Sequence, residues 1–397
     1  MADVVFNPMD PEFVANPYPM YHRLRAEDPV HQSPLGFWVL TRYEDVVFAL
    51  RDARLAKEAI TSVVAQRFGI VNPPTITRSM LDSDPPDHTR MRALVNKAFT
   101  PRVVEHLRPR VQAIVDDLLA RVDERHSMDL IEDFAYPIPV IVICELLGVP
   151  VEDRDHFRAW GLDMARSLDA VLFGPHSDVA ERGAAARHAL GDYFRDLIAE
   201  RRKAPRQDML SGLIAAEEAG ERLTEAEMLA TCILLLVAGH ETTVNLIGNG
   251  TLALLRNPDQ LRRLREDPSL IGTAVEELLR YDGPVQRTAR IPNEDVTIGG
   301  RIIPKGELVM PFIGAADRDP AQFPDPERLD ITRTDNRHIA FGWGIHFCLG
   351  APLARVEGQI AIGTLVRRLP NLRLATEAPA FRQSLTLRGL SALPVTF

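Results

Sequence analysis

The chain has 397 residues, 46% of them apolar and 25% charged, which is the composition of a globular protein able to bury a sizeable core. A formal net charge of −9 and the lack of a basic block argue against non-specific nucleic-acid binding. Cys144, Cys232 and Cys348 lie far apart without a CxxC motif, which indicates neither a disulfide framework nor a zinc site and favours the reducing cytoplasm. The start, MADVVFNPMDPEF, has no signal-peptide pattern and no apolar anchor, so we expect no membrane anchor.

The N-terminal part combines helical and strand-like patterns. NPYPMYHRLRAED has a helical pattern, and strand-like runs follow at residues 30–32 and 37–41. Residues 43–51 return to a helical pattern. We therefore expect a small sheet near residues 28–45.

The middle of the chain is predicted to be helical. After a loop-like stretch at 69–87, the sequence Asp84-Pro-Pro-Asp predicts a helix start with an acidic N-cap and proline in the first turn. From His88 to about Asp282 nearly every segment has helical periodicity. The run 232–239 is too short and interrupted to span a bilayer, so it predicts a buried helix. Breaks are expected at four proline-containing sites: Gly148-Val-Pro150, Gly174-Pro, Ala204-Pro and Asn257-Pro.

In the C-terminal part, the sequence pattern changes from helical to strand-like. Residues 284–335 contain the strand-like pieces TARI, DVTIGG, RIIPKG and ELVMPF, and residues 351–369 form a final predicted helix before a strand-like end. No linker separates two domains. We therefore predict one mainly α domain over 1–397, with small β-sheets near 28–45, 284–335 and the C-terminus.

The segment FGWGIHFCLG, residues 341–350, places Cys348 directly before the last predicted helix. The free N–H groups and dipole of a helix N-terminus favour a thiolate, which is a good metal ligand. An isolated cysteine in such a chain is more often a structural residue. The flanking residues argue against that alternative, because the glycines let the backbone approach a large flat group. The flanking residues meant are Phe341, Gly342, Gly344, His346 and Gly350.

This segment resembles the haem-binding signature of cytochrome P-450, FGxGxHxCxG, at every fixed position. The resemblance implies haem b (iron protoporphyrin IX) with Cys348 as the proximal iron ligand and His346 as a partner of a haem propionate. It also implies the α-rich P-450 fold, with a long helix over the distal haem face and the cysteine loop on the proximal face. The cofactor-binding residues implied in this loop are Phe341, Gly342, His346, Cys348 and Gly350.

A Glu-Thr pair interrupts the apolar helix in AGHETT, residues 238–243. Such a pair faces a partner or a cavity, although a threonine can also bond back to the carbonyl four residues earlier. The segment is similar to the family's (A/G)-Gly-x-(Asp/Glu)-Thr-Thr. The similarity implies haem contacts for Ala238 and Gly239, and it implies that Glu241 and Thr242 are the acid–alcohol pair that delivers protons.

Glu277 and Arg280 in EELLR are three residues apart and share one helix face. Taken alone, they form an ordinary solvated pair. The family has Glu-x-x-Arg at this distance before its cysteine and a later arginine, which PDPERL supplies as Arg328. The resemblance implies a buried Glu277–Arg280–Arg328 network that supports the cysteine loop.

His88 and Arg92 in DHTRMR are four residues apart and suit an anionic group, although a surface face is the alternative. In the family, this pair binds a haem propionate. Arg290 in PVQRTAR matches the arginine that reaches the haem from the following strand, and Arg287 lies nearby.

These resemblances imply a soluble, bacterial-type P-450 monooxygenase that inserts one oxygen atom of O2 into an apolar organic substrate by hydroxylation or epoxidation. Electrons from NAD(P)H have to come through a ferredoxin or flavodoxin and its reductase, because the chain has no room for a flavin or iron–sulfur domain. The candidate partner contacts are Lys97, Arg102 and Arg355. Two alternatives are an H2O2-driven peroxygenase, disfavoured by the acid–Thr pair, and a non-catalytic haem-thiolate sensor.

By analogy with the family, five segments line the substrate pocket. Most of their residues are apolar, which suits a lipid, terpene, steroid or macrolide-like compound without choosing among them. The segments are 57–80, 167–173, 235–238, 284–288 and the C-terminal turn, residues 384–389.

Overall fold

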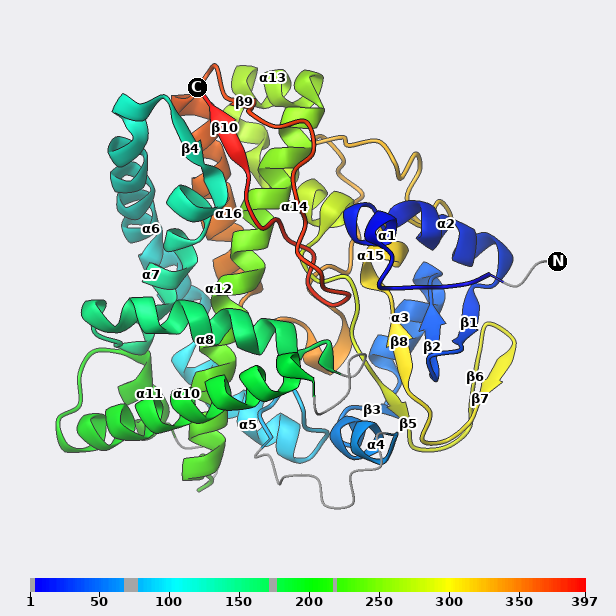
Figure 1. Ribbon diagram of the computed structural model, residues 1–397. Coiled ribbons are helices and arrows are strands. Elements are labelled where there is room, and N and C mark those ends of the chain that lie inside the picture. Colours follow the sequence, from blue (N-terminus) through cyan, green and yellow to red (C-terminus); the bar gives the residue numbers. More distant parts are fainter. Residues whose placement is uncertain (1–3, 68–77, 171–176, 217–219) are drawn as a thin grey trace. The chain divides into compact units, whose positions relative to one another are not determined.

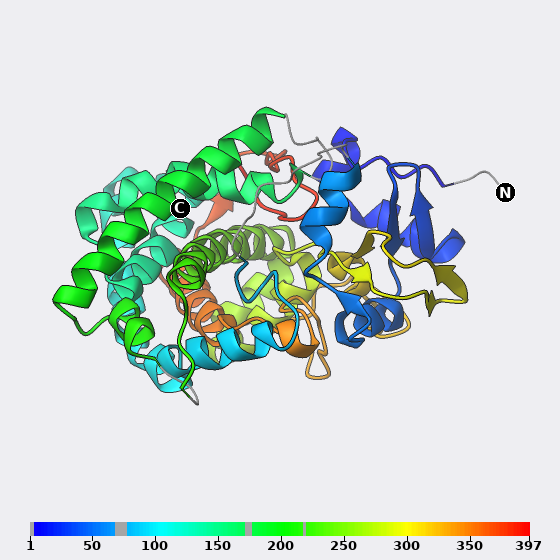
Figure 2. The ribbon, with the colours of Figure 1, turned by 90° about the horizontal axis from the view of Figure 1, so that it is seen from below.

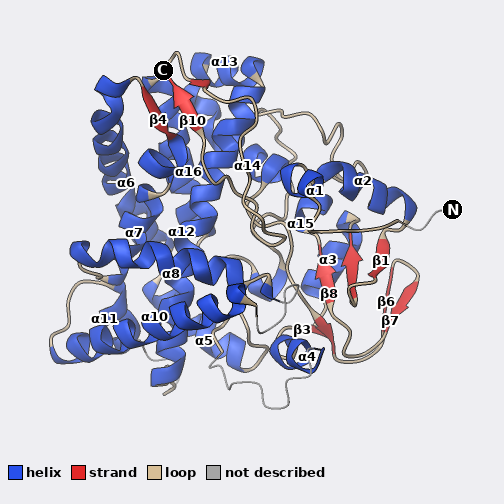
Figure 3. Cartoon of the chain, viewed as in Figure 1, coloured by secondary structure: helices blue, strands red, loops and turns tan. Residues whose placement is uncertain are grey.

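The computed structural model describes residues 4–67, 78–170, 177–216 and 220–397 (Figure 1). The chain divides into two compact units. The first unit comprises Met1–Ala56, Arg108–Ile138 and Thr242–Phe397, and the second comprises Lys57–Leu107 and Pro139–Glu241. Helices dominate both units and the sheets are small (Figure 3), which confirms the predicted mainly α class. The prediction of one domain over 1–397 stays a prediction.

The first unit holds most of the short N-terminal helices and the long C-terminal one. Its helices are α1 (Pro11–Ala15), α2 (Tyr18–Glu27), α3 (Tyr43–Arg51), α13 (Pro258–Glu266), α14 (Ile271–Asp282), α15 (Ile313–Ala316) and α16 (Ala351–Arg368). Short 3₁₀ or π turns lie at Asp123–Arg125, Leu130–Ala135, Pro268–Leu270 and Gly344–His346. The predicted helices at 43–51 and 351–369 are confirmed by α3 and α16.

The first unit also holds the sheets. The largest joins β1 (Val30–Ser33) antiparallel to β2 (Phe37–Leu40) and β2 parallel to β8 (Val309–Pro311), with Trp38 opposite Val309. The other strands are β3 (Leu55–Ala56) with β5 (Ile291–Pro292), β6 (Val296–Ile298) with β7 (Arg301–Ile303), and β10 (Pro394–Thr396) between β4 (Ser127–Asp129) and β9 (Arg373–Leu374). The sheets expected near 28–45, 284–335 and the C-terminus are confirmed, whereas β3 and β4 were not expected.

The second unit is built from helices. They are α4 (Ile60–Arg67), α5 (Asp87–Ala98), α8 (Arg154–Ser167), α10 (Asp178–Lys203) and α11 (Met209–Ala215), with a 3₁₀ turn at Val151–Asp153. Helices α8 and α10 lie side by side (Figure 2), with Phe157 edge-on to Tyr193 at 4.9 Å between ring centroids. The breaks expected near Gly148 and Ala204 are confirmed. The break at Gly174 lies outside the described residues.

The start of α5 corrects one expectation. The helix begins at Asp87, and Pro86 occupies its N-cap without a side-chain hydrogen bond. The Asp84 carboxylate does not cap this helix, because it accepts hydrogen bonds from the backbone N–H groups of Lys57 and Glu58 at 3.0 and 2.8 Å. Two donors from a distant segment thus compete successfully with the local helix for this acid.

Three helices continue from one unit into the other: α6 (Pro101–Val122), α7 (Pro137–Leu147) and α12 (Glu225–Arg256). Within the described parts of the chain, α12 alone is long and apolar enough to cross a membrane, but most of its apolar stretch is buried, as in the core helix of a soluble protein. In the first unit it packs closely on α14, since a Cβ at Gly250 would lie 3.1 Å from a methyl of Leu278. Such close packing holds α12 firmly against its neighbours.

Candidate functional site

The cysteine loop (residues 341–350) places its thiol at the start of α16. The backbone N–H of Cys348 donates to the carbonyl of Phe341 at 2.9 Å, which closes the loop three residues before α16 begins. Cys348 is exposed, whereas Cys144 and Cys232 are buried, and burial raises the pKa of Cys232 to about 12. Among the three thiols, Cys348 is therefore the one that can reach a ligand.

In the rest of the loop, glycines let the backbone pass close to its neighbours, and apolar side chains are exposed. Gly342 and Gly344 each have φ of +73°, and a Cβ on Gly344 would lie 2.7 Å from the carbonyl oxygen of Leu50. Both positions therefore require glycine. The side chains of Trp343, Ile345 and Phe347 are 37%, 50% and 40% exposed. An exposed thiol among exposed apolar side chains fits a large apolar group that carries a thiolate-binding metal.

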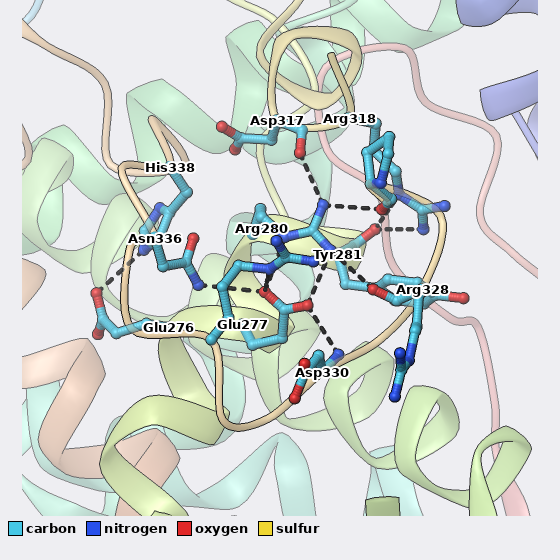
Figure 4. A network of polar contacts seen from close by, with 12 residues as sticks. Glu276, Glu277, Arg280, Tyr281, Asp317, Arg318, Arg328, Asp330, Asn336 and His338 are labelled. Carbon is cyan, nitrogen blue, oxygen red and sulfur yellow. Dashed lines mark hydrogen bonds and ion pairs between the residues drawn. The ribbon is translucent and has the colours of Figure 1, made fainter. Parts of the chain in front are cut away.

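The Glu-x-x-Arg pair lies in α14, and both side chains are fully buried (Figure 4). Arg280 donates to Glu277 twice, from Nε to Oε2 at 2.8 Å and from Nη2 to Oε1 at 2.9 Å. Its remaining donors reach the backbone carbonyls of Asp317 and Pro326 at 3.0 and 2.9 Å. The pair thus ties α14 to the segment that leads toward the cysteine loop.

Arg328 departs from the expected role. Its side chain is exposed and points away from Glu277 (Figure 4), and only its backbone carbonyl takes part, accepting from Arg280 Nη2 at 3.2 Å. The second arginine beside Glu277 is Arg333, which donates from Nε to Oε2 at 3.2 Å. PDPERL supplies an arginine at the family's spacing, but its guanidinium takes no part in the buried network.

A second carboxylate next to the loop, which is half-buried, was missed in the sequence. Glu276 accepts from Arg355 at 2.7 and 2.8 Å and from His338 Nε2 at 3.0 Å, while His338 Nδ1 accepts from the backbone N–H of Ala340. Burial opposes ionisation of Glu276, but the hydrogen bonds from Arg355 and His338 outweigh it and lower its pKa to about 2. The Arg355 guanidinium also lies 4.6 Å from the centroid of the Phe341 ring. Arg355, predicted as a partner contact, therefore braces the loop. In the sequence, the two adjacent glutamates of EELLR were the only local sign of the Glu276–Arg355 contact.

The expected acid–alcohol pair lies on α12. Glu241 is buried and Thr242 is half-buried. Ala238, one turn earlier, is exposed, whereas residues 234–237 and 239–242 are buried or half-buried. At Gly239 a Cβ would lie 3.2 Å from the side chain of Ile143 in α7. The helix therefore leaves a small-residue face uncovered at Ala238, beside the polar pair.

A further carboxyl that the sequence reading missed lies behind this helix. Glu357 in α16 is 1% exposed, hydrogen-bonds Thr243, and has an Oε2 atom without a hydrogen-bond partner. Burial raises the pKa of Glu357 to about 8, so this side chain holds its proton at neutral pH. The only sequence signal was a glutamate nine residues after the cysteine.

The predicted propionate ligands occur in both units. In the second unit, His88 is buried on α5, and its pKa is lowered by burial and then by the charge of Arg92 one turn away. An anion beside the pair would relieve that repulsion. In the first unit, Arg290 is buried and exchanges two backbone hydrogen bonds with Val309, and Arg287 is buried as well. Within the first unit, the buried arginines, the exposed thiol and the apolar loop are the kinds of group that would hold a haem and one of its carboxylates.

Comparisons with known proteins agree with these observations. The family "Cytochrome P450" matches residues 30–372. The chain is 49% identical over 392 residues to the vitamin D(3) 25-hydroxylase of Pseudonocardia autotrophica, covering 97% of this chain and 94% of that protein. It is also similar to two solved structures. One is the myxobacterial cytochrome P450 CYP267B1 with myristic acid, which has a TM-score of 0.90, 47% identity and 98% of each chain covered.

The other is CYP164A2 of Mycobacterium smegmatis with econazole, which has a TM-score of 0.91, 43% identity and 98% of each chain covered. The family match spans most of the chain, and the relatives match along their whole length. Membership in this family implies a haem cofactor. The chain therefore belongs to the cytochrome P450 family and is one of its monooxygenases.

Proposed function

We propose that this monooxygenase inserts one oxygen atom of O2 into an apolar organic substrate, by hydroxylation or epoxidation, with electrons from an external ferredoxin or flavodoxin and its NAD(P)H-dependent reductase. The observation that carries the proposal is the exposed Cys348 thiol at the start of α16, in a closed loop of apolar side chains. We also propose that residues 1–397 act as a single catalytic domain.

The haem, when bound, supplies the oxygen-activating chemistry, which a thiolate ligand favours. Cys348 would be that ligand, held in place by its N–H bond to Phe341 and kept in the thiolate form by the N-terminus of α16. The buried pair Glu277–Arg280 and the Glu276–Arg355 pair brace the two flanks of the loop. His346 and Arg290 would bind one haem carboxylate, and His88 with Arg92 the other.

Glu241 and Thr242 would move protons to the reacting oxygen. They follow the uncovered Ala238 by three and four residues on α12, so an acid and a hydroxyl flank the helix face at Ala238. The carboxyl of Glu241 would take a proton from solvent, and the Thr242 hydroxyl would hold a water and pass the proton on. General acid–base assistance of this kind is typically worth about 10²–10⁴-fold in rate.

The substrate would be apolar and of lipid, terpene, steroid or macrolide type. Among the described positions of the expected pocket, Leu235 is buried and Leu387 lies opposite Val285 in an isolated β-bridge. Relatives support this class, since one is named for vitamin D(3) and another has a structure with myristic acid. Ile70, Leu172 and Phe173, which we also expected in the pocket, lie outside the described residues.

The reductant would dock on the face that carries the cysteine loop. Lys97 and Arg102 are exposed and suit an acidic ferredoxin, and the protein would act in the cytoplasm. The test uses the reduced protein with CO, where thiolate-bound haem gives a strongly red-shifted Soret band that Cys348→Ser should abolish and Cys144→Ser should keep. Turnover should then require NAD(P)H and a surrogate ferredoxin system. Turnover supported only by H2O2 would indicate a peroxygenase, and ligand binding without turnover would indicate a sensor.

A further inference from the structure

Helix α12 carries a polar stripe in which two asparagines follow the proposed proton donor Thr242, and proton delivery does not explain these asparagines. Thr242, Asn245 and Asn249 follow one another at spacings of three and four, so they lie on one face of the helix. Both asparagine side chains are 1% exposed. A buried amide is retained where it has hydrogen-bond partners, so the partners show what the stripe does.

The partners belong to the C-terminal turn (residues 384–389), to the residues next to it and to the end of α14, all within the first unit. Asn249 Nδ2 donates to the backbone carbonyl of Arg388 at 3.0 Å and to that of Asp282 at 3.2 Å. The Oδ1 atom of Asn245 accepts from Arg382 Nη2 at 3.3 Å. The two asparagines therefore hold both ends of the turn against α12.

The contact between Asn245 and Gly389 is steric. A Cβ built on Gly389 would lie 2.0 Å from Asn245 Oδ1 and 2.4 Å from its Cγ. Atoms do not approach so closely, so the turn rests directly on the Asn245 amide. A side chain at position 389 would have to displace either the turn or the Asn245 amide, which is itself buried.

The opposite side of the turn is fixed to the strand segment after α14. The N–H of Gln286 donates to the carbonyl of Thr386 at 2.9 Å, and the N–H of Arg388 donates to the carbonyl of Pro284 at 2.8 Å. The Arg388 guanidinium also donates to the Asp282 carboxylate at 2.6 Å. The turn is thus held between this segment and α12, and its position depends on the size of the group at Asn245.

We infer that Asn245 is a positioning residue, which sets the distance between the C-terminal turn and Thr242 and so shapes the substrate site. The inference rests on the proposed function, in which this turn lines that site. Thr242 and Asn245 are three residues apart on the helix, and such residues have Cβ atoms about 5–6 Å apart. The turn that contacts Asn245 is therefore held close to the proposed proton donor. Leu387 lies in this turn, between Thr386 and Arg388.

The test measures the dissociation constants of two azoles that bind haem iron, with imidazole as the small probe and econazole as the large one. The ratio of the two constants is compared between variants. Gly389→Ala should displace the turn and weaken econazole relative to imidazole by about tenfold, because overpacking at one contact shifts the backbone. Adding Asn245→Ala removes the amide against which the new methyl group clashes. The econazole-to-imidazole ratio of the double variant should therefore return to within about threefold of the native ratio. Gly250→Ala in the same helix, which meets only apolar side chains, is the matched control and should keep the native ratio.

Hydrogen exchange gives a second measurement that does not depend on azole binding. Asn245→Ala should speed exchange in peptides covering residues 382–390, and the β6–β7 hairpin should exchange as in the native protein. An unchanged azole ratio in Gly389→Ala, or no restoration in the double variant, would overturn the inference. If Gly389→Ala does not incorporate haem, the exchange result for Asn245→Ala decides, and native exchange at 382–390 refutes the inference. A native protein that shows no spectral shift with imidazole contradicts the proposed function, and exchange still decides the role of Asn245.

Discussion

Arg280 and Glu277 are joined by two hydrogen bonds, at 2.8 and 2.9 Å, and both side chains are fully buried. Glu277→Ala leaves the Arg280 charge buried without its carboxylate, which should lower the free energy of unfolding by about 3–5 kcal/mol. Urea unfolding and haem content measure the effect.

The matched control for this prediction is Arg328→Ala. Its side chain is exposed and only its backbone carbonyl meets Arg280, so the free energy of unfolding should change no more than for other surface substitutions. Arg333→Ala should fall between the two, because its Nε donates to Glu277. A loss for Arg328→Ala as large as that for Glu277→Ala would restore Arg328 as a member of the network.

Glu357 should make the stability of the protein depend on pH. Burial raises its pKa to about 8 in the folded state, above the ordinary value of about 4.3 that we expect in the unfolded chain. Between these values the folded state binds the extra proton, so the free energy of unfolding should fall as pH rises through this window and level off above about pH 8. Urea unfolding across the window should show a weaker decline in Glu357→Gln.

Asp317 contributes a decline of the same sign, because burial raises its pKa to about 7. Asp317→Asn should therefore remove the part of the decline below about pH 7, while Glu357→Gln removes the part that extends to about pH 8. If Glu357→Gln declines as steeply as the native protein up to about pH 8, Glu357 is already ionised in the folded state.

Thr242→Ala should separate oxygen consumption from product formation. Without the hydroxyl that holds a water beside Glu241, NADPH consumption should continue while product falls and H2O2 rises. Haem incorporation, the CO spectrum and substrate binding should survive, because none of them needs that proton. The measurement is the ratio of product to NADPH consumed.

Thr251→Val, buried farther along α12, is the control and should keep the native ratio. Glu241→Gln should instead slow the whole cycle, because it removes the acid that feeds the pair. A Thr242→Ala variant that keeps the native ratio with a substrate lacking hydroxyl groups would show that Thr242 does not deliver the proton.

Charge reversal should distinguish docking residues from bracing residues. Lys97→Glu and Arg102→Glu should slow reduction by an acidic ferredoxin and weaken its dependence on salt, because both side chains are exposed. Arg355→Glu should mainly lower the free energy of unfolding, because it places a like charge against Glu276. Stopped-flow reduction and urea unfolding measure the two effects. Native reduction kinetics in both the Lys97 and the Arg102 variants would move the docking site elsewhere.

Local patterns were enough to predict the parts of this protein that depend on near neighbours in the chain. The helices at 43–51 and 351–369, the strands after residue 30, and Cys348 before α16 all follow from residues a few positions apart. Hydrogen-bond spacing and side-chain periodicity act over that range, so one segment carries its own signal. The cysteine and its glycines were visible for the same reason.

Contacts between distant segments were decided only by the tertiary structure. Strand β4 pairs with β10, which lies near the other end of the chain. The Asp84 carboxylate accepts hydrogen bonds from the backbone of Lys57 and Glu58 instead of capping its own helix. Asn245 contacts a turn that is well over a hundred residues away in the sequence. The sequence supplied an arginine at position 328, but its side chain is exposed and Arg333 lies beside Glu277 instead. Spacing along the chain limits which residues can meet, whereas the direction of each side chain depends on the packing of the elements that carry it.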